Sequence, residues 1–277
     1  MHNADGVAPY ALGHSEQELA RLERQGEIFA GDTREVLRRA GVAPGMRVLD
    51  IGCGIGDVAL IAGEMVGPSG SVVGIDRAAG ALPLAEARAR RLGYDWVSFR
   101  DADLYAFEPD GKFDALVGRF ILMHIPDPVG AIRRLAAACL NPGASVAFIE
   151  LDIEAAGAVP DLPLLSTCIG WIAATYRRVG AEPNMGSRLY ATFRAAGLSP
   201  ALTGMTHIAP ANDVAVFTFT ADTLTSLLPK MEGYDVATAA EVDLDTLAAR
   251  LHRAAVAGDH CIFMPRLVGA WARVGEG

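Results

Sequence analysis

A carboxylate and three glycines within residues 48–56 form the part of the chain whose chemistry is easiest to recognise. The segment reads Val-Leu-Asp-Ile-Gly-Cys-Gly-Ile-Gly, so an apolar run carrying Asp50 leads into a turn with Gly52, Gly54 and Gly56. Glycines in such a turn let a ligand approach the backbone, and the N-terminus of a following helix attracts anions. The pattern predicts a nucleotide-like ligand above the turn.

A dinucleotide site has a different glycine pattern. The motif Gly-x-Gly-x-x-Gly places its last glycine where this chain has Asp57. Asp50 and Asp57 would then both face a pyrophosphate, and like charges a few ångströms apart in a partly dry site repel by roughly several kcal/mol. A ligand with an ammonium and a sulfonium group suits the turn better, which favours S-adenosylmethionine.

A second acidic residue ends the next apolar run. Residues 72–76 read Val-Val-Gly-Ile-Asp, and Asp76 lies twenty residues after Gly56. A carboxylate at the end of a second strand can accept hydrogen bonds from both hydroxyls of a ribose. The spacing therefore predicts that Asp76 binds the sugar of the same ligand.

These segments resemble the class I S-adenosylmethionine-dependent methyltransferases of the small-molecule type, strongly over residues 45–151 and weakly elsewhere. The resemblance implies that the cofactor is S-adenosyl-L-methionine and that the product is S-adenosyl-L-homocysteine. Because His207, His252 and His260 lack metal-ligand spacing and the sequence has no acidic metal cluster, we expect no metal. The cofactor-binding residues that the resemblance implies are Tyr10, Gln25, Asp50, Gly52, Cys53, Gly54, Asp76, Arg77, Asp103, Leu104 and Arg119.

The implied contacts run along an elongated ligand. Asp50 and the glycine turn frame the methionine end, and Asp76 takes the ribose. Spacing favours Asp103 over Asp101 as the partner of the adenine amino group. Arg119, at the turn out of the fourth strand, is expected to meet the methionine carboxylate or to support the loop beside the sulfonium.

Two N-terminal segments match a subgroup of the family in which they approach the cofactor. They are Tyr-Ala-Leu-Gly, which begins at Tyr10, and Arg-Leu-Glu-Arg-Gln, which runs from Arg21 to Gln25. The match predicts cofactor contacts for Tyr10 and Gln25, and ordinary packing or surface roles remain the alternative.

Two residues are candidates for catalysis. His124 has an ordinary pKa suited to a base near neutral pH. Glu150, at the end of the fifth strand, can bind an acceptor amine or hydroxyl. The alternatives are a packing role for His124 and a supporting hydrogen bond for Glu150, because transfer from a sulfonium mainly requires alignment and desolvation of the nucleophile.

The elements that position these residues alternate between strands and helices, which predicts an α/β fold with a doubly wound, Rossmann-like parallel sheet. The family resemblance adds a seven-stranded sheet with its last strand antiparallel. The expected strands are 47–51, 71–75, one near 97, 113–117 and 145–151, with a final antiparallel pair at 202–208 and 261–268. All the candidate residues of the sheet lie at strand ends, where ligands bind in such folds.

The remaining segments divide the chain into a core and additions. We expect an N-terminal helical cap over residues 1–44 and a core made of residues 45–153, 185–209 and 260–277. Residues 154–184 and 210–259 are expected to be helical insertions that form a lid and substrate pocket. Within them Trp171, Tyr176, Phe217 and Phe219 can wall an aromatic pocket, and a dimer interface is the alternative use of the insertions.

Amino-acid composition limits the classes of substrate that the protein can be expected to bind. The 277 residues are 51% hydrophobic with a formal net charge of −9, which disfavours a nucleic-acid substrate. Four scattered cysteines, no basic leader and no long apolar run predict a cytoplasmic protein that does not span a membrane. The leading hypothesis is methyl transfer to O, N or C of a secondary metabolite. An NAD-dependent oxidoreductase and a non-catalytic S-adenosylmethionine-binding protein are the alternatives, and a homodimer remains open.

Overall fold

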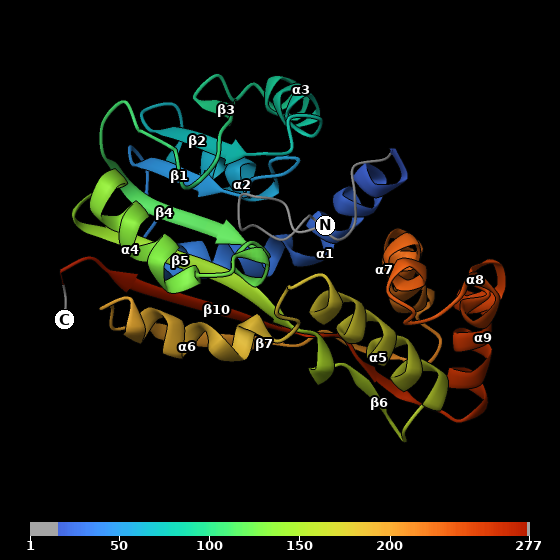
Figure 1. Ribbon diagram of the computed structural model, residues 1–277. Coiled ribbons are helices and arrows are strands. Elements are labelled where there is room, and N and C mark those ends of the chain that lie inside the picture. Colours follow the sequence, from blue (N-terminus) through green and yellow to red (C-terminus); the bar gives the residue numbers. More distant parts are fainter. Residues whose placement is uncertain (1–15, 276–277) are drawn as a thin grey trace.

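A computed structural model describes residues 16–275, and side chains from Arg21 onward. Its main feature is a seven-stranded sheet in the order β3-β2-β1-β4-β5-β10-β7 (Figure 1). The strands are β1 (Arg47–Ile51), β2 (Ser71–Asp76), β3 (Val97–Asp101), β4 (Phe113–Arg119), β5 (Leu140–Asp152), β7 (Ala201–Met205) and β10 (Arg266–Arg273).

The direction of the strands confirms the predicted fold class. Strands β1 to β5 pair in parallel, as in Val48 opposite Val72 and Ala115. Strand β10 runs antiparallel to both β5 and β7. The last strand in the sequence is therefore inserted against the direction of its neighbours, as the family resemblance implies.

Helices cover both faces of the sheet because apolar side chains alternate along its strands. Val48 packs into a cluster with α1 and α2, whereas Leu49 packs into a second cluster with α4 and α6. The helices are α1 (Glu16–Arg39), α2 (Asp57–Val66), α3 (Leu82–Leu92), α4 (Pro128–Cys139), α5 (Pro163–Arg178), α6 (Met185–Ala195), α7 (Val214–Gly233), α8 (Ala239–Val242) and α9 (Leu244–Ala257).

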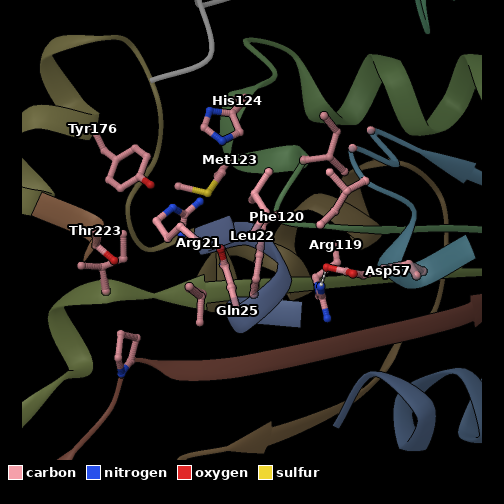
Figure 2. Close-up of a pocket in the computed structure, with 18 of the residues that line it drawn as sticks. Arg21, Leu22, Gln25, Asp57, Arg119, Phe120, Met123, His124, Tyr176 and Thr223 are labelled. Atoms are coloured by element: carbon pink, nitrogen blue, oxygen red, sulfur yellow. Dashed lines mark hydrogen bonds and ion pairs between the residues drawn. The ribbon is translucent and has the colours of Figure 1, made fainter. Parts of the chain in front are cut away.

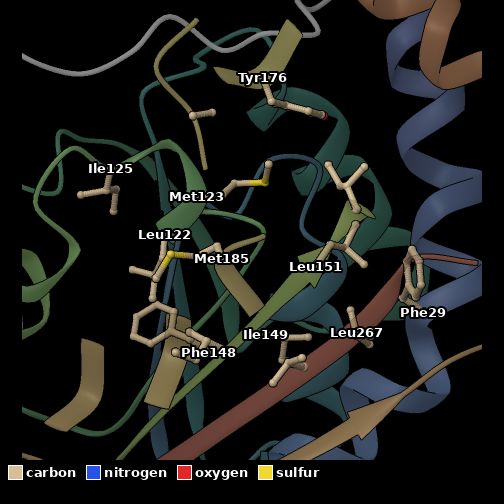
Figure 3. Packing of buried hydrophobic residues seen from close by; sticks show 14 of the residues in the cluster. Phe29, Leu122, Met123, Ile125, Phe148, Ile149, Leu151, Tyr176, Met185 and Leu267 are labelled. Atoms are coloured by element: carbon tan, nitrogen blue, oxygen red, sulfur yellow. The ribbon is translucent and has the colours of Figure 1, made fainter. Parts of the chain in front are cut away.

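The middle of the second cluster supports the loop after β4. Phe148, Ile149 and Leu151 of β5 pack with Leu267 of β10, and Leu122 and Met123 lie above them (Figure 3). Leu122 and Met123 belong to η1 (Leu122–His124), a short 3-10 helix. The sheet core thus holds in place a loop that carries candidate site residues.

The last strands of the chain pair differently from the prediction. Strand β10 pairs with β7 in the main sheet, with Leu267 opposite Met205. Residues 261–263 instead form β9 (Cys261–Phe263), the centre of a small sheet with β6 (Gly157–Val159) and β8 (Ile208–Pro210). The predicted pairing of 202–208 with 261–268 is therefore split. Pro265 lies at the break, and its missing N–H cannot extend a ladder.

The additional helices gather at one end of the sheet. Helices α5, α7, α8 and α9 lie together beyond the carboxyl ends of β4 and β5 (Figure 1). The segment 154–184 also contains η2 (Ile153–Ala155) in part and strand β6, so it is less purely helical than expected. In the described part of the chain, no helix is long and apolar enough to cross a bilayer.

Candidate functional site

A cavity of about 460 Å³ opens at the carboxyl ends of β1, β2 and β4. Its cofactor half is lined by the glycine turn, the end of β2 and residues 102–104. Its acceptor half is lined by α5, α7 and residues 262–265. Helix α1 and the loop after β4 lie between the two halves (Figure 2).

The glycine turn presents bare backbone to the cofactor half. Gly54 has a φ of 51°, and a β-carbon there would meet no atom within 4 Å. Its N–H donates to Asp76 Oδ2 at 2.8 Å, and the Ala78 N–H donates to Oδ1 at 2.8 Å. Asp76 therefore fixes the turn and also lines the cavity. Gly52, Cys53 and Arg77 line the cavity as well.

Asp50 lies beneath the turn rather than in the cavity wall. It is fully buried, and neither carboxylate oxygen has a hydrogen-bond partner among the described residues. Burial raises the pKa of Asp50 well above its usual range, with the nearby charge of Arg119 acting in the opposite direction. A contact between Asp50 and the methionine end stays a prediction.

Asp57 is not an unpaired carboxylate beside the glycine turn, contrary to the expectation of two repelling charges. Asp57 Oδ1 lies 2.7 Å from Arg88 Nη1, and Asp57 Oδ2 lies 3.0 Å from Arg119 Nη2. Two arginines therefore compensate the charge of Asp57, and burial favours the protonated form of Asp50. The missing last glycine still separates this turn from a dinucleotide motif, but charge repulsion does not.

Arg119 occupies the junction between α1, α2 and β4. Its side chain is 6% exposed and lines the cavity, and Nη1 donates to Thr33 Oγ1 at 2.8 Å. Burial lowers the pKa of Arg119, while Asp57 opposes this shift. The guanidinium binds side chains of α1 and α2, and both predicted roles of Arg119 stay predictions.

Asp103 and Leu104 lie at the far end of the cofactor half. Asp103 Oδ1 accepts the Tyr105 N–H at 2.8 Å, and Oδ2 lies 3.8 Å from Arg77 Nη1. Asp103 lines the cavity, whereas Asp101 is exposed outside it. The arrangement favours Asp103 for the predicted adenine contact.

Helix α1 contributes a buried polar pair to the cavity. Arg21 Nη1 donates to Gln25 Oε1 at 2.7 Å, and both residues line the cavity. The predicted cofactor residue Tyr10 lies outside the described residues. Gln25 is thus placed within reach of a ligand, and its cofactor contact remains a prediction.

The two candidate catalytic residues occupy different places. His124 lines the cavity, and burial lowers its pKa to about 4, so the ring is neutral at pH 7. Glu150 is fully buried and does not line the cavity; its Oε1 accepts the N–H groups of Ile121 at 3.0 Å and Leu122 at 2.7 Å. Burial raises the pKa of Glu150 to about 8. This geometry favours the supporting role for Glu150.

The acceptor half is built from residues that sequence reasoning mostly missed. Tyr176 and Phe219 line it as expected, but Phe217 is fully buried in the core and Trp171 is outside the lining. The signal that was available is helical spacing, which places one face of α5 and one face of α7 toward the cavity. Those faces carry Leu165, Ile169, Ile172 and Tyr176, and Val216, Phe219, Thr220 and Thr223.

Among residues 16–275, no three His, Cys, Asp or Glu side chains gather where they could hold a metal ion. The expectation of a metal-free reaction stays a prediction.

Comparison with known proteins agrees with this geometry. A family model described as a methyltransferase domain matches residues 43–163. Aklanonic acid methyltransferase DauC of Streptomyces sp. is 36% identical over 151 residues, which cover 53% of this chain and 67% of that protein. The 2-phytyl-1,4-naphtoquinone methyltransferase of Synechococcus elongatus is 36% identical over 122 residues, which cover 43% of this chain and 51% of that protein. The chain thus spans about half the length of that relative.

A solved structure supports the fold. The YcgJ protein of Bacillus subtilis aligns over 89% of this chain and 100% of its own, with a TM-score of 0.57 and 18% identity. These findings do not favour an NAD-dependent oxidoreductase. Three observations indicate the same family. They are the sheet with β10 antiparallel, the glycine turn followed by Asp76, and the sequence relatives. The chain belongs to the class I S-adenosylmethionine-dependent methyltransferases.

Proposed function

We propose that this protein transfers a methyl group from S-adenosylmethionine to O, N or C of an apolar small molecule. The observation that carries the proposal is one continuous cavity with two unlike halves. The first has Gly54, Asp76 and Asp103, and the second has almost entirely apolar walls from α5 and α7. Such a cavity suits a polar nucleoside at one end and an apolar acceptor at the other.

The cofactor half fits S-adenosylmethionine. Gly54 leaves room for close approach of a ligand to the backbone, and Asp76 and Asp103 offer acceptors for hydroxyl and amino groups. Asp50 lies beneath the turn with two unpartnered carboxyl oxygens, which can accept a hydrogen bond from the methionine end. When bound, the cofactor supplies an electrophilic methyl group on a sulfonium sulfur and leaves as S-adenosylhomocysteine.

The protein's own contribution is alignment, exclusion of water and, for a protonated acceptor, removal of a proton. His124 is the candidate base because it lines the cavity, although its pKa of about 4 makes it a weaker base than the ordinary imidazole expected from the sequence. Glu150 positions the loop by accepting the N–H groups of Ile121 and Leu122. Arg119 fixes the same loop to α1 and α2.

We assign the acceptor to secondary metabolism and the protein to the cytoplasm. The apolar acceptor half supports a ring-bearing acceptor, and two relatives are named for aklanonic acid and a phytyl naphtoquinone. All four cysteines are free thiols, in keeping with a reducing compartment. Residues 154–184 and 210–259 act in this proposal as the lid and pocket over the acceptor.

The test is transfer of isotope-labelled methyl from S-adenosylmethionine to a panel of aromatic hydroxy, carboxy and amino compounds. The proposal predicts label in at least one extracted product with an equal amount of S-adenosylhomocysteine formed. Asp76→Ala should weaken cofactor binding by about tenfold to a hundredfold, because it removes charged hydrogen bonds. Cofactor binding without transfer to any acceptor would favour the non-catalytic alternative.

A further inference from the structure

Phe120 has a backbone conformation that bulky residues rarely adopt. Its φ is 57°, in the left-handed region where a β-carbon crowds the backbone and where glycine is the usual residue. The neighbouring turn uses Gly52 and Gly54 for this purpose, with φ of 65° and 51°. A phenylalanine held in a strained conformation at the end of β4 indicates that its side chain has a use.

Hydrogen bonds to β5 hold Phe120 in this conformation. Its N–H donates to the Ile149 carbonyl at 2.9 Å. The next two N–H groups, those of Ile121 and Leu122, donate to the buried Glu150 carboxyl at 3.0 Å and 2.7 Å. The loop is thus tied to β5 at three successive residues, which fixes the direction in which the Phe120 side chain leaves the backbone.

Phe120 lies where the two halves of the cavity meet. In Figure 2, Arg119 and Asp57 lie on one side of it, and Tyr176 and Thr223 lie on the other. Phe120 is partly buried and lines the cavity. The guanidinium carbon of Arg119 lies 5.3 Å from the centre of the Phe120 ring. An acceptor has to reach the cofactor at this junction, so the ring is placed to contact it.

A second ring of the cavity wall shares a support with Phe120. Phe29 of α1 is fully buried, and its ring centre lies 5.5 Å from that of Phe120 and 6.3 Å from that of Phe219. Both pairs are edge to face, with interplanar angles of 83° and 81°, which is a favoured arrangement of aromatic rings. Phe219 of α7 lines the acceptor half. Phe29 therefore holds two cavity-lining rings that come from different elements.

We infer that Phe120 and Phe219 are specificity-determining residues that select an acceptor with a planar aromatic ring. Two aromatic rings in contact gain free energy from their electrostatic complementarity in addition to the burial of apolar area. A saturated ring of the same size gains only from burial. This inference rests on the proposed function, because it concerns the acceptor that occupies the same cavity.

The test is calorimetry on the full chain saturated with S-adenosylhomocysteine, using two neutral ligands with one carbon skeleton. 2-Naphthol has two aromatic rings, decahydro-2-naphthol has the same rings saturated, and each carries one hydroxyl. 2-Naphthol should bind about threefold to tenfold more tightly, which corresponds to the usual gain from an aromatic pair. Equal or tighter binding of the saturated compound, or no binding of either compound, would overturn the inference.

Variants test whether the two rings cause the preference. Phe120→Leu and Phe219→Leu keep an apolar side chain without a planar face, so each should lower the ratio of the two affinities by about twofold or more. The double substitution should bring the ratio close to one, whereas Phe120→Tyr keeps a ring and should keep the ratio. Tyr190→Leu is the matched control and should leave the ratio unchanged, because it removes a ring that is 55% exposed on α6.

Three outcomes separate this role from simpler ones. If Phe120→Leu weakens the binding of both naphthols by the same factor, the ring only packs against its neighbours and the inference fails. If Phe120→Leu weakens only S-adenosylhomocysteine, Phe120 is a cofactor residue and the inference fails as well. If the unmodified protein binds no S-adenosylhomocysteine, the proposed function itself falls.

Discussion

The Arg119 guanidinium lies 3.0 Å from the Asp57 carboxylate, and the two side chains are 6% and 13% exposed. This ion pair joins the end of β4 to the start of α2, directly beside the glycine turn. Arg88 of α3 holds the other oxygen of Asp57 at 2.7 Å. The position where a dinucleotide motif has a glycine is here the centre of a buried charge network.

Asp57→Asn should strongly destabilise the protein. The substitution leaves Arg88 and Arg119 buried without the charge that compensates them, and loss of one partner of a buried pair costs about 3 to 5 kcal/mol. Urea unfolding measures the free energy directly. Arg38→Gln removes an exposed pair with Glu35 on α1 and should leave the free energy of unfolding almost unchanged. Equal effects of the two substitutions would show that the Asp57 network is not stabilising.

Two glycines of α1 should respond in opposite ways to alanine. A β-carbon at Gly26 would overlap both carboxylate oxygens of Asp57, whereas one at Gly31 would meet nothing within 4 Å. Gly26→Ala should lower the free energy of unfolding by about 1 to 3 kcal/mol through overpacking. Gly31→Ala should raise it by about 0.5 to 1 kcal/mol through helix propensity. Similar stabilisation by both, in urea unfolding, would mean that α1 does not sit closely on α2.

Glu150 should make stability depend on pH. Burial raises its folded pKa to about 8 from an ordinary value of 4.5, so between these values the unfolded chain is ionised while the folded one keeps its proton. The stability from this group is complete below pH 4.5 and is lost as pH rises toward 8, at up to about 1.4 kcal/mol per pH unit.

Glu150→Gln removes the titrating group and keeps a carbonyl oxygen for Ile121 and Leu122. The free energy of unfolding of the unmodified protein, relative to that of Glu150→Gln, should therefore fall as pH rises between 4.5 and 8. Urea unfolding at several pH values in this window gives the comparison. Parallel curves would mean that Glu150 is ionised in the folded state.

Asp103 and Asp101 form a matched pair for the adenine contact. Asp103 lines the cavity, and Asp101 lies outside it at the exposed end of β3. Asp103→Ala should weaken binding of S-adenosylhomocysteine by about tenfold, whereas Asp101→Ala should leave it within about twofold. A larger loss with Asp101→Ala in calorimetry would reverse this assignment.

The sequence predicts the parts of the site that depend on local order. Strand β1, the glycine turn and Asp76 follow each other within 30 residues, and parallel strands bring Asp76 and Asp103 to the same edge without further information. Glu150 and Asp50 could be placed at strands in the same way. Their burial, however, depends on everything packed around them.

The features that the sequence does not predict depend on contacts between residues far apart in the chain. Asp57 meets Arg88 and Arg119, which are 31 and 62 residues away, and no local pattern pairs them. Pro265 interrupts the run 261–268 and marks a possible break, but the sheet that each half joins depends on its partner strands. The inward faces of α5 and α7 have helical spacing, but spacing alone does not distinguish a cavity wall from a core.

The central claim is that this cavity binds S-adenosylmethionine, and calorimetry with S-adenosylhomocysteine tests it most directly. The account predicts saturable binding at one site per chain with a dissociation constant in the micromolar range or below, weakened by Asp76→Ala. Absence of binding of both S-adenosylhomocysteine and S-adenosylmethionine at micromolar concentrations would contradict it.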